Sequence, residues 1–156
     1  MAATQHAFPE FELGLAAKTI NLTSDTLTVG LIASTSPVFT WGATPEAYLY
    51  VSSFLAGDGT HGALTELSGG GYSRQALTSV TFTASGENDT LTSANPAWTT
   101  ATFNTTYAFL YDSTVGGSDA AHPLIAYWDF GGTQSVSAAT FTLTLGANGW
   151  CQWQYQ

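Results

Sequence analysis

The chain has 156 residues, 44% of them hydrophobic, which is enough for one domain with a real core and argues against intrinsic disorder. Only 8% of the residues are charged, the formal net charge is −9, and the only bases of the Lys or Arg type are Lys18 and Arg74. Because nucleic-acid affinity comes mainly from Lys and Arg, this balance argues against a nucleic-acid-binding surface. No run of eighteen apolar residues occurs, so no membrane-spanning helix is expected.

The low charge is unusual, since ordinary soluble domains have roughly 25% charged residues. Ser, Thr, Gly and Ala take their place, and such a surface is weakly solvated for a free monomer. It suits a protein that packs against copies of itself or against a large partner. Met1–Gln5 has no basic region followed by an apolar one, and the single cysteine, Cys151, excludes an intramolecular disulfide. We therefore expect no signal peptide and folding in the cytosol of the producing cell.

Two helices are expected in the first half of the chain. Glu10–Leu15 alternates as a strand would, but Pro9–Ile20 also places Phe11 and Leu15 on one helical face, and a proline suits the first turn. We favour a short helix here, although Gly14 counts against it. Thr44–Glu46 has the signals of a second helix start, and Gly57 those of its end. The segment between them is too apolar for an exposed helix, so it must dock on the sheet or on a neighbouring subunit.

The remaining elements are expected to be strands, because apolar and polar residues alternate in them. These strands lie at Thr26–Leu31, within Tyr72–Ala84, from Thr90 to a stop at Pro96, and at Phe141–Leu145 and Cys151–Gln156. Trp98 and Phe103 lead into a further, central strand.

Two apolar runs, Thr106–Tyr111 and Pro123–Phe130, are expected at the centre of the sheet. Their residues are apolar in succession and not only in alternation, so both faces must be covered. The polar connection Asp112–His122 between them indicates a hairpin. Gly131–Gly132 is expected to break the chain after the second run.

These elements predict one domain, residues 1–156, of the mainly β class. Seven or eight short strands, with turn signals about every ten residues, indicate an antiparallel β-sandwich or jelly roll with one or two short helices near the N-terminus. A helical arm would occupy about residues 8–20, and about residues 44–61 would form an insertion.

No group of residues has the spacing of a reaction centre, so we expect no catalytic residue, cofactor or metal site. His6, His61 and His122 share no metal-binding spacing, and Asp58–Gly62 has the composition of an ordinary turn. No nucleophile motif occurs. The eleven acidic residues leave a glycosidase-like carboxylate pair open by count, although no pair stands out.

The aromatic residues leave a second alternative open. They could line a carbohydrate site, but such residues are equally typical of a core or a subunit interface, and we favour the latter two. The residues concerned are Trp41, Tyr48, Tyr50, Trp98, Trp128, Trp150, Trp153 and Tyr155.

The stretch Glu66–Gln75 reads Glu-Leu-Ser-Gly-Gly-Gly-Tyr-Ser-Arg-Gln. Its three glycines permit a positive φ or a close approach to another backbone. They let Tyr72 pack its ring inward and form a hydrogen bond at its tip. Arg74 is the only arginine, and Glu66 is its expected partner across the turn. We expect a structural contact between the two, either within the subunit or across an interface.

This stretch resembles a recurrent signature of small virion proteins of tailed bacteriophages. Further motifs of that group match in the same order, at Thr26–Leu31, Asn95–Trp98, Leu110–Asp112 and Pro123–Gly131. The resemblance spans roughly residues 8–146, and it departs from the pattern at Thr44–His61 and Trp150–Gln156.

The resemblance implies a non-enzymatic β-sandwich protein of the virion, made in the host cytoplasm and located on the capsid surface as a decoration or cement protein. Its partners would be the major capsid protein and copies of itself, as a dimer or trimer, with no nucleic acid and no membrane. The alternatives are a tail-tube, tail-tip or fibre-base component and a carbohydrate-binding host-attachment module. The candidate interface residues are Glu66, Tyr72, Arg74, Tyr48, Tyr50, Phe54, Leu55, Trp150, Trp153 and Tyr155.

Overall fold

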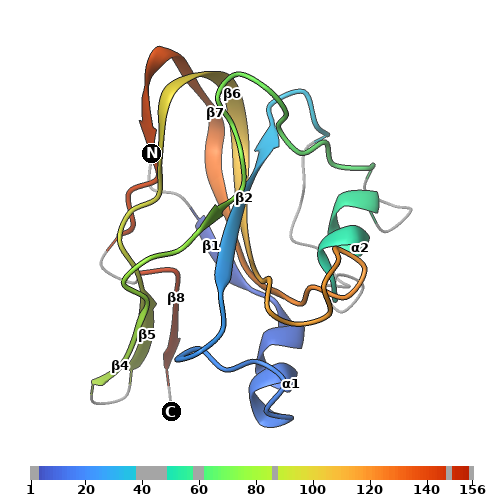
Figure 1. The fold of residues 1–156 in the computed structure, drawn as a ribbon, viewed down its shortest axis with the longest axis vertical. Helices are drawn as coiled ribbons and strands as arrows, with labels where there is room; N and C mark the ends of the chain where they lie inside the picture. The colour runs from blue at the N-terminus through green and yellow to red at the C-terminus, as the bar shows by residue number, and fades with distance from the viewer. Residues whose placement is uncertain (1–3, 38–48, 58–61, 86–87, 147–148, 155–156) are drawn as a thin grey trace.

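Two antiparallel sheets make up most of the computed structural model, which describes residues 4–37, 49–57, 62–85, 88–146 and 149–154 (Figure 1). The larger sheet has the strand order β1-β7-β6-β2-β3, and the smaller has the order β4-β5-β8. The elements are β1 Thr4–Ala7, α1 Pro9–Ala16, β2 Leu27–Ala33, α2 Val51–Ala56, β3 Gln75–Ala76, β4 Thr81–Ser85, β5 Asn88–Thr92, β6 Ala97–Asp112, β7 Leu124–Thr142 and β8 Cys151–Gln154. The predicted mainly β, sandwich-like class is therefore confirmed.

The two apolar runs form the predicted hairpin at the centre of the larger sheet, where β6 pairs antiparallel with β7. Phe109 and Leu110, which are adjacent in β6, are both fully buried. Phe109 packs in one hydrophobic cluster and Leu110 in another, on opposite faces of the sheet. Alternation along the strand and burial on both faces explain the uninterrupted apolar sequence.

The strands of this hairpin are long, with 16 residues in β6 and 19 in β7, and not short as predicted. Gly131–Gly132 was expected to break the chain, but both residues lie inside β7, with φ of 69° and 149°. Glycine tolerates these angles, so the strand bends while its ladder with β6 continues. Register shifts along β6, which are typical of β-bulges, bend the ribbon further, and it arches over at the top of Figure 1.

The first core lies between the larger sheet and a second layer, made by the arched halves of β6 and β7 and the smaller sheet. Leu27, Val29 and Leu31 of β2 contribute one side of it. Trp128 of β7 meets Trp150 edge-to-face, with the ring centroids 4.5 Å apart. Helix α1 closes one end of this core through the buried Phe11.

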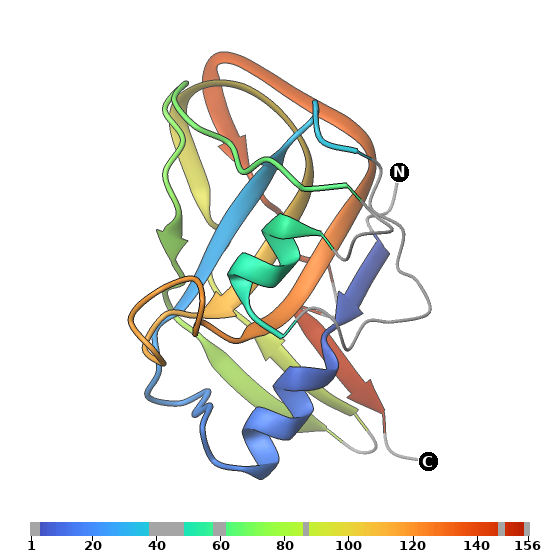
Figure 2. The same cartoon turned by 90° about the vertical axis from the view of Figure 1, so that its right-hand side faces the viewer.

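The second core lies on the other face of the larger sheet, under α2 (Figure 2). Val51 and Phe54 of α2 are buried, so the segment docks on its own sheet. The expected helix start at Thr44–Glu46 lies outside the described residues. A helix running without interruption to Gly57 is wrong, because Leu124 N–H donates to the Leu49 carbonyl at 3.2 Å and Tyr50 forms a β-bridge with Pro123. These β-type contacts keep Leu49 and Tyr50 out of the helix, so α2 begins at Val51.

Helix α1 is shorter than the predicted arm and ends at Ala16. Lys18, just after it, has a φ of 58°, which is incompatible with continuing the helix. Phe11 fixes α1 to the core, whereas Leu13 on the outer side is 62% exposed. No helix in the described part of the chain has the length and hydrophobicity needed to cross a membrane.

Candidate functional site

The Glu66–Gln75 stretch lies along the open edge of β2. Strand β3 pairs with only two residues of β2, Thr28 and Val29. Beyond them the edge is covered by the incoming segment, where Leu67 N–H donates to the Leu31 carbonyl at 2.9 Å and Ala33 N–H donates to the Thr65 carbonyl at 2.8 Å. These hydrogen bonds satisfy backbone N–H and C=O groups at the edge of β2, although no full strand pairs with it there.

The three glycines serve both purposes predicted for them. Gly69, Gly70 and Gly71 have φ of 72°, 59° and 79°. The Gly70 carbonyl accepts a hydrogen bond from Thr102 N–H of β6 at 2.8 Å. A Cβ on Gly70 would collide with the Thr102 carbonyl oxygen, so only glycine permits this approach.

Tyr72 follows this turn and packs inward as predicted, with its ring 6.2 Å from that of Trp98. Its hydroxyl donates to Glu66 Oε1 at 2.6 Å and accepts from Leu31 N–H at 3.0 Å. The hydroxyl therefore accepts a hydrogen bond from the β2 backbone beyond the two residues that pair with β3. Burial, and then the hydrogen bond to Glu66, raise the pKa of Tyr72 well above its usual value, so the phenol stays neutral.

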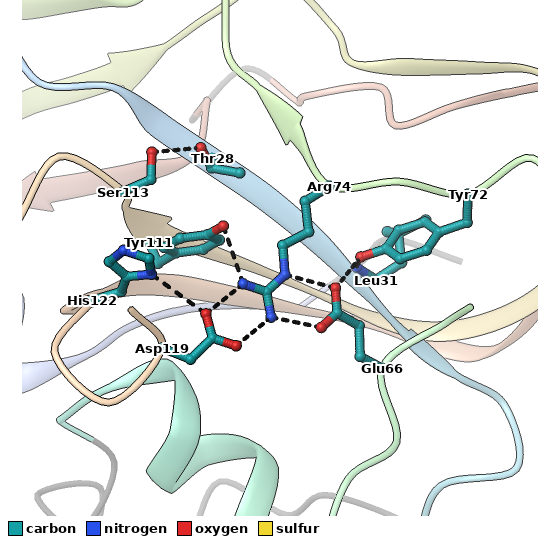
Figure 3. A network of polar contacts seen from close by, with 9 residues as sticks. All are labelled: Thr28, Leu31, Glu66, Tyr72, Arg74, Tyr111, Ser113, Asp119 and His122. Carbon is teal, nitrogen blue, oxygen red and sulfur yellow. Dashed lines mark hydrogen bonds and ion pairs between the residues drawn. The ribbon is translucent and has the colours of Figure 1, made fainter. Parts of the chain in front are cut away.

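Arg74 joins two acidic side chains from opposite ends of the site (Figure 3). Its Nε and Nη2 donate to the Glu66 carboxylate at 2.7 and 2.6 Å, and its Nη1 and Nη2 donate to Asp119 at 2.6 and 2.7 Å. Nη1 also donates to the Tyr111 hydroxyl at 3.2 Å. A guanidinium has five N–H groups, so these five bonds use all of them.

Rings line the same site. The Arg74 guanidinium carbon lies 5.5 Å from the Phe109 ring centroid and 5.1 Å from that of Tyr111, within cation–π range. His122 stacks on Tyr111 with centroids 5.2 Å apart, and its Nδ1 is 3.4 Å from Asp119 Oδ1. We call Glu66, Tyr72, Arg74, Tyr111 and Asp119 the arginine cluster.

The charges of the arginine cluster support each other. The hydrogen bond from Arg74 is the largest cause that holds the pKa of Asp119 below its usual value. The bonds to Glu66 and then to Asp119 raise the pKa of Arg74 above its already high value. The side chains of Arg74 and Glu66 are each 22% exposed, and that of Asp119 is 38% exposed. The ion pairs are thus partly shielded from water and persist at neutral pH.

The arginine cluster is built for cohesion within the subunit. The predicted contact between Arg74 and Glu66 is confirmed, and it forms inside the chain. Because all five guanidinium N–H groups already have acceptors, Arg74 has none left for a partner or substrate. The cluster joins the Glu66–Gln75 stretch to the Asp112–His122 connection beside Tyr111 of β6.

Sequence reasoning missed part of this site. Asp119 lies 45 residues from Arg74, in a connection interpreted only as a polar turn. Tyr111 ends an apolar run that the sequence predicts to be covered on both faces, and it is buried, but its hydroxyl faces the arginine. The one available signal was that a lone arginine with five donors needs more acceptors than Glu66 supplies.

The other candidate interface residues are distributed differently from the expectation. Phe54 is 1% exposed and Trp150 is 0% exposed, with the Trp150 Nε1 donating to Ser93 Oγ at 2.7 Å, so their side chains offer no surface to a partner. Tyr50 and Leu55 are half-buried. Tyr48, Tyr155 and the side chain of Trp153 lie outside the described residues. Trp98 and Trp128 are also buried. Together with Trp150, three of the aromatic side chains considered for a carbohydrate site are therefore removed from that role.

The arched ends of β6 and β7 carry a surface without charge. There is no Asp, Glu, Lys, Arg or His in Thr90–Tyr111 or in Phe130–Gln156. Within these stretches, residues 97–105 pair with residues 134–142, and we call this two-stranded segment the neutral ribbon. Its exposed side chains are mainly Thr, Ser, Ala and Asn. It contains a shallow hollow of about 380 Å³ lined by Thr102, Phe103, Asn104, Ser135, Val136 and Ser137.

A second acidic contact lies at the opposite end of β6. Asp112 is fully buried beside the Asp25 carboxyl. Burial is the largest cause that raises the pKa of Asp112 to about 6, and the neighbouring Asp25 carboxyl adds to it. The described part of the chain contains no group of three His, Cys, Asp or Glu side chains placed to hold a metal. Asp58 and His61 lie outside the described residues.

Comparisons with known proteins add no relative to this picture. The chain matches no protein-family model, no curated protein and no solved structure. The fold therefore defines a class only, an antiparallel β protein of two sheets with two short helices.

Proposed function

We propose that the chain is a non-enzymatic structural protein of a bacteriophage virion, acting as a capsid decoration or cement protein. The neutral ribbon carries this proposal. A net charge of −9 keeps most proteins of this size apart from one another, yet here the charged residues are excluded from one long two-stranded surface. The bacteriophage part of the proposal is supported by the resemblance of Glu66–Gln75 and the motifs that follow it.

The chemistry of the neutral ribbon suits burial against another protein. Burying an unpaired charge costs much more free energy than burying a hydroxyl or amide that finds a hydrogen-bond partner. Depletion of charged residues is also what distinguishes the centre of an interface from the rest of a protein surface. Major capsid subunits and further copies of the chain are the proposed partners.

The arginine cluster supports the same function by fixing the shape of the subunit. Arg74 ties the stretch after Glu66 to the Asp112–His122 connection, and Gly70 holds the same stretch against the neutral ribbon through Thr102. A surface that is rigid before binding loses less conformational entropy on docking. A cement protein gains most from such rigidity, because it must resist movement of the subunits that it bridges.

Electron microscopy of whole particles tests the location. Many copies distributed over the shell, with the neutral ribbon turned toward capsid subunits, is the expected result. A few copies at a single vertex would instead place the chain in the tail, as a tail-tube, tail-tip or fibre-base component. No copies in the particle would overturn the virion proposal altogether.

The hollow in the neutral ribbon favours one second candidate, a carbohydrate-binding host-attachment module. Hydroxyl and amide groups of Thr102, Asn104, Ser135 and Ser137 line it, and such groups can hydrogen-bond a neutral sugar. Its aromatic residue, Phe103, is largely buried and offers little ring face for stacking. A glycan array that shows binding by the wild-type chain and none by Asn104→Ala would support this candidate, and an array without hits would remove it.

A further inference from the structure

We propose that Asp25 and Asp112 form a binding site for a divalent cation of the calcium type. The two carboxyl groups come from the Asn21–Asp25 turn and from the end of β6. The pair shares no residue with the arginine cluster or with the neutral ribbon, so this proposal does not rest on the proposed virion function.

Asp112 has one carboxyl oxygen that receives no N–H or O–H hydrogen bond in a fully buried position. The residue is 0% exposed, and it pairs with Leu27 of β2 across the ladder. Its Oδ1 accepts a hydrogen bond from Thr114 N–H at 2.8 Å. Its Oδ2 is buried and accepts from no N–H or O–H group of the residues that the structure describes, and the Asp112 and Asp25 carboxyl groups contact each other. Two carboxyl groups in such contact need either a shared proton or a cation between them.

The backbone holds Asp25 beside it. Thr26 N–H donates to Thr114 Oγ1 at 2.7 Å, and Ser113 N–H donates to the Thr26 carbonyl at 2.9 Å. The Asp25 carboxylate is itself oriented by Asn21 N–H at 2.5 Å and by Ser24 Oγ at 3.2 Å. Each carboxyl is thus positioned by neighbouring backbone, and the pair is organised before any ligand arrives.

Among the residues that the structure describes, no base forms an ion pair with these two carboxyl groups. Its only Lys and Arg residues are Lys18 and Arg74. Arg74 is fully engaged in the arginine cluster. Between the described residues, no ion pair joins Lys18 to either carboxylate. Two adjacent carboxylates without a base repel each other, and a cation from solution would remove both the repulsion and the orphaned oxygen.

Calcium fits the donor set better than other common ions. The donors are carboxylate oxygens, which hard cations prefer, and no histidine or cysteine completes a group with them in the part of the chain that the structure describes. Asp25 is half-exposed, so water can complete the coordination of calcium, which tolerates irregular geometry better than magnesium does. With only two charged ligands, a dissociation constant on the order of 10⁻⁴ to 10⁻³ M is expected.

The test is calcium titration of the full chain at pH 7.5 after removal of metal with a chelator. Isothermal titration calorimetry should find one calcium ion per chain. Calcium at ten times its dissociation constant should also raise the folding equilibrium constant about 11-fold, measured by urea denaturation. Sodium chloride at equal ionic strength corrects for general screening of the negative charge, and magnesium tests selectivity.

Three variants decide whether the effect belongs to this pair. Asp112→Asn keeps the shape, removes one charge and should abolish both the calcium heat and the extra stability. Asp25→Asn, at a half-exposed position, gives the same readout if Asp112→Asn fails to fold. Glu12→Gln removes one exposed acid on α1 and should respond as the wild type does. The proposal is overturned if calcium acts no more strongly than sodium, or if all three variants respond equally. A pair that merely shares a proton would give the first of these results.

Discussion

Arg74 is the residue on which the contacts of three separate segments converge. Its guanidinium bonds to Glu66, to Asp119 and to Tyr111, and it lies against two aromatic rings. Lysine could not replace it, because a single ammonium group cannot donate to both carboxylates in parallel pairs. Without the arginine, two carboxylates would face each other in a partly buried site.

We expect Arg74→Gln to lower the free energy of unfolding by about 2–4 kcal/mol, through lost charge-assisted bonds and two uncompensated acids. The matched control is Lys18→Gln, which removes the other base from an exposed position. That control should change stability by less than about 0.5 kcal/mol. Urea denaturation of both variants measures the difference. Equal midpoints for the two variants would contradict the role given to Arg74.

Asp119 makes stability depend on pH in a defined direction. Its pKa is lower in the folded chain than in the unfolded chain, mainly because of Arg74. The unfolded state therefore binds more protons, and the contribution of Asp119 is complete above its ordinary pKa of about 3.9. It is lost as the pH falls through the lower folded value.

We therefore expect Asp119→Asn to be less stable than wild type at pH 7, with the gap narrowing below about pH 4. Thermal unfolding between pH 7 and pH 3 measures both chains. A gap of constant size over this range would show that the carboxylate charge of Asp119 contributes nothing. Glu12→Gln, on the exposed side of α1, is the control and should follow the wild-type curve.

At the scale of elements, the Gly69–Gly71 turn connects the edge of β2 to the neutral ribbon. All three residues have positive φ, yet their surroundings differ. Gly70 touches the backbone of β6 at Thr102, whereas nothing lies within 4 Å of a Cβ placed on Gly69. This difference separates the cost of the backbone conformation from the cost of close approach.

Gly69→Ala should cost about 1–2 kcal/mol of unfolding free energy, because alanine resists the left-handed region. Gly70→Ala should cost at least about 2 kcal/mol more, because its Cβ must also displace Thr102. Chemical denaturation of the two variants gives the comparison. Equal costs would mean that the turn and β6 can separate freely.

The long hairpin also belongs to this scale. Bulges in β6 and the pair Gly131–Gly132 in β7 bend both strands, so one hairpin contributes to both layers of the fold. Its central half is buried on both faces and its outer half becomes the neutral ribbon. A break at the glycines would have left this outer half without its ladder.

For the whole molecule, charge is segregated. The arginine cluster and the Asp25–Asp112 pair lie in segments separate from the neutral ribbon, where an interface would require little desolvation of charge. A charged residue introduced on the ribbon should therefore weaken binding to a partner without affecting the fold.

Thr140→Lys is the variant that tests this, because Thr140 is exposed on the neutral ribbon. We expect at least tenfold weaker binding to capsids that lack the protein, measured by co-sedimentation, with an unchanged unfolding midpoint. Thr83→Lys on β4, an exposed threonine away from the ribbon, is the control and should bind normally. Undiminished binding by Thr140→Lys would remove the ribbon as the docking face.

Properties of consecutive residues were readable from the sequence alone. Alternation predicted β2 and β8, unbroken apolarity predicted the covered β6–β7 hairpin, and the glycines before Tyr72 predicted both positive φ and close approach. The contact between Glu66 and Arg74 was also predicted, since only one short turn separates them. Each of these features depends on local backbone geometry or on the burial of residues that are close together in the sequence.

Tertiary structure alone decided the features that join distant residues. It brought Asp119 to Arg74, placed Asp25 beside Asp112, turned Gly131–Gly132 into a bend and buried Trp150 against Trp128. No local pattern encodes these outcomes, because they depend on strand register and on how far each strand bends before it ends. Strand bending also decided that the uncharged stretches of sequence lie side by side, and so formed the surface on which the proposed function rests.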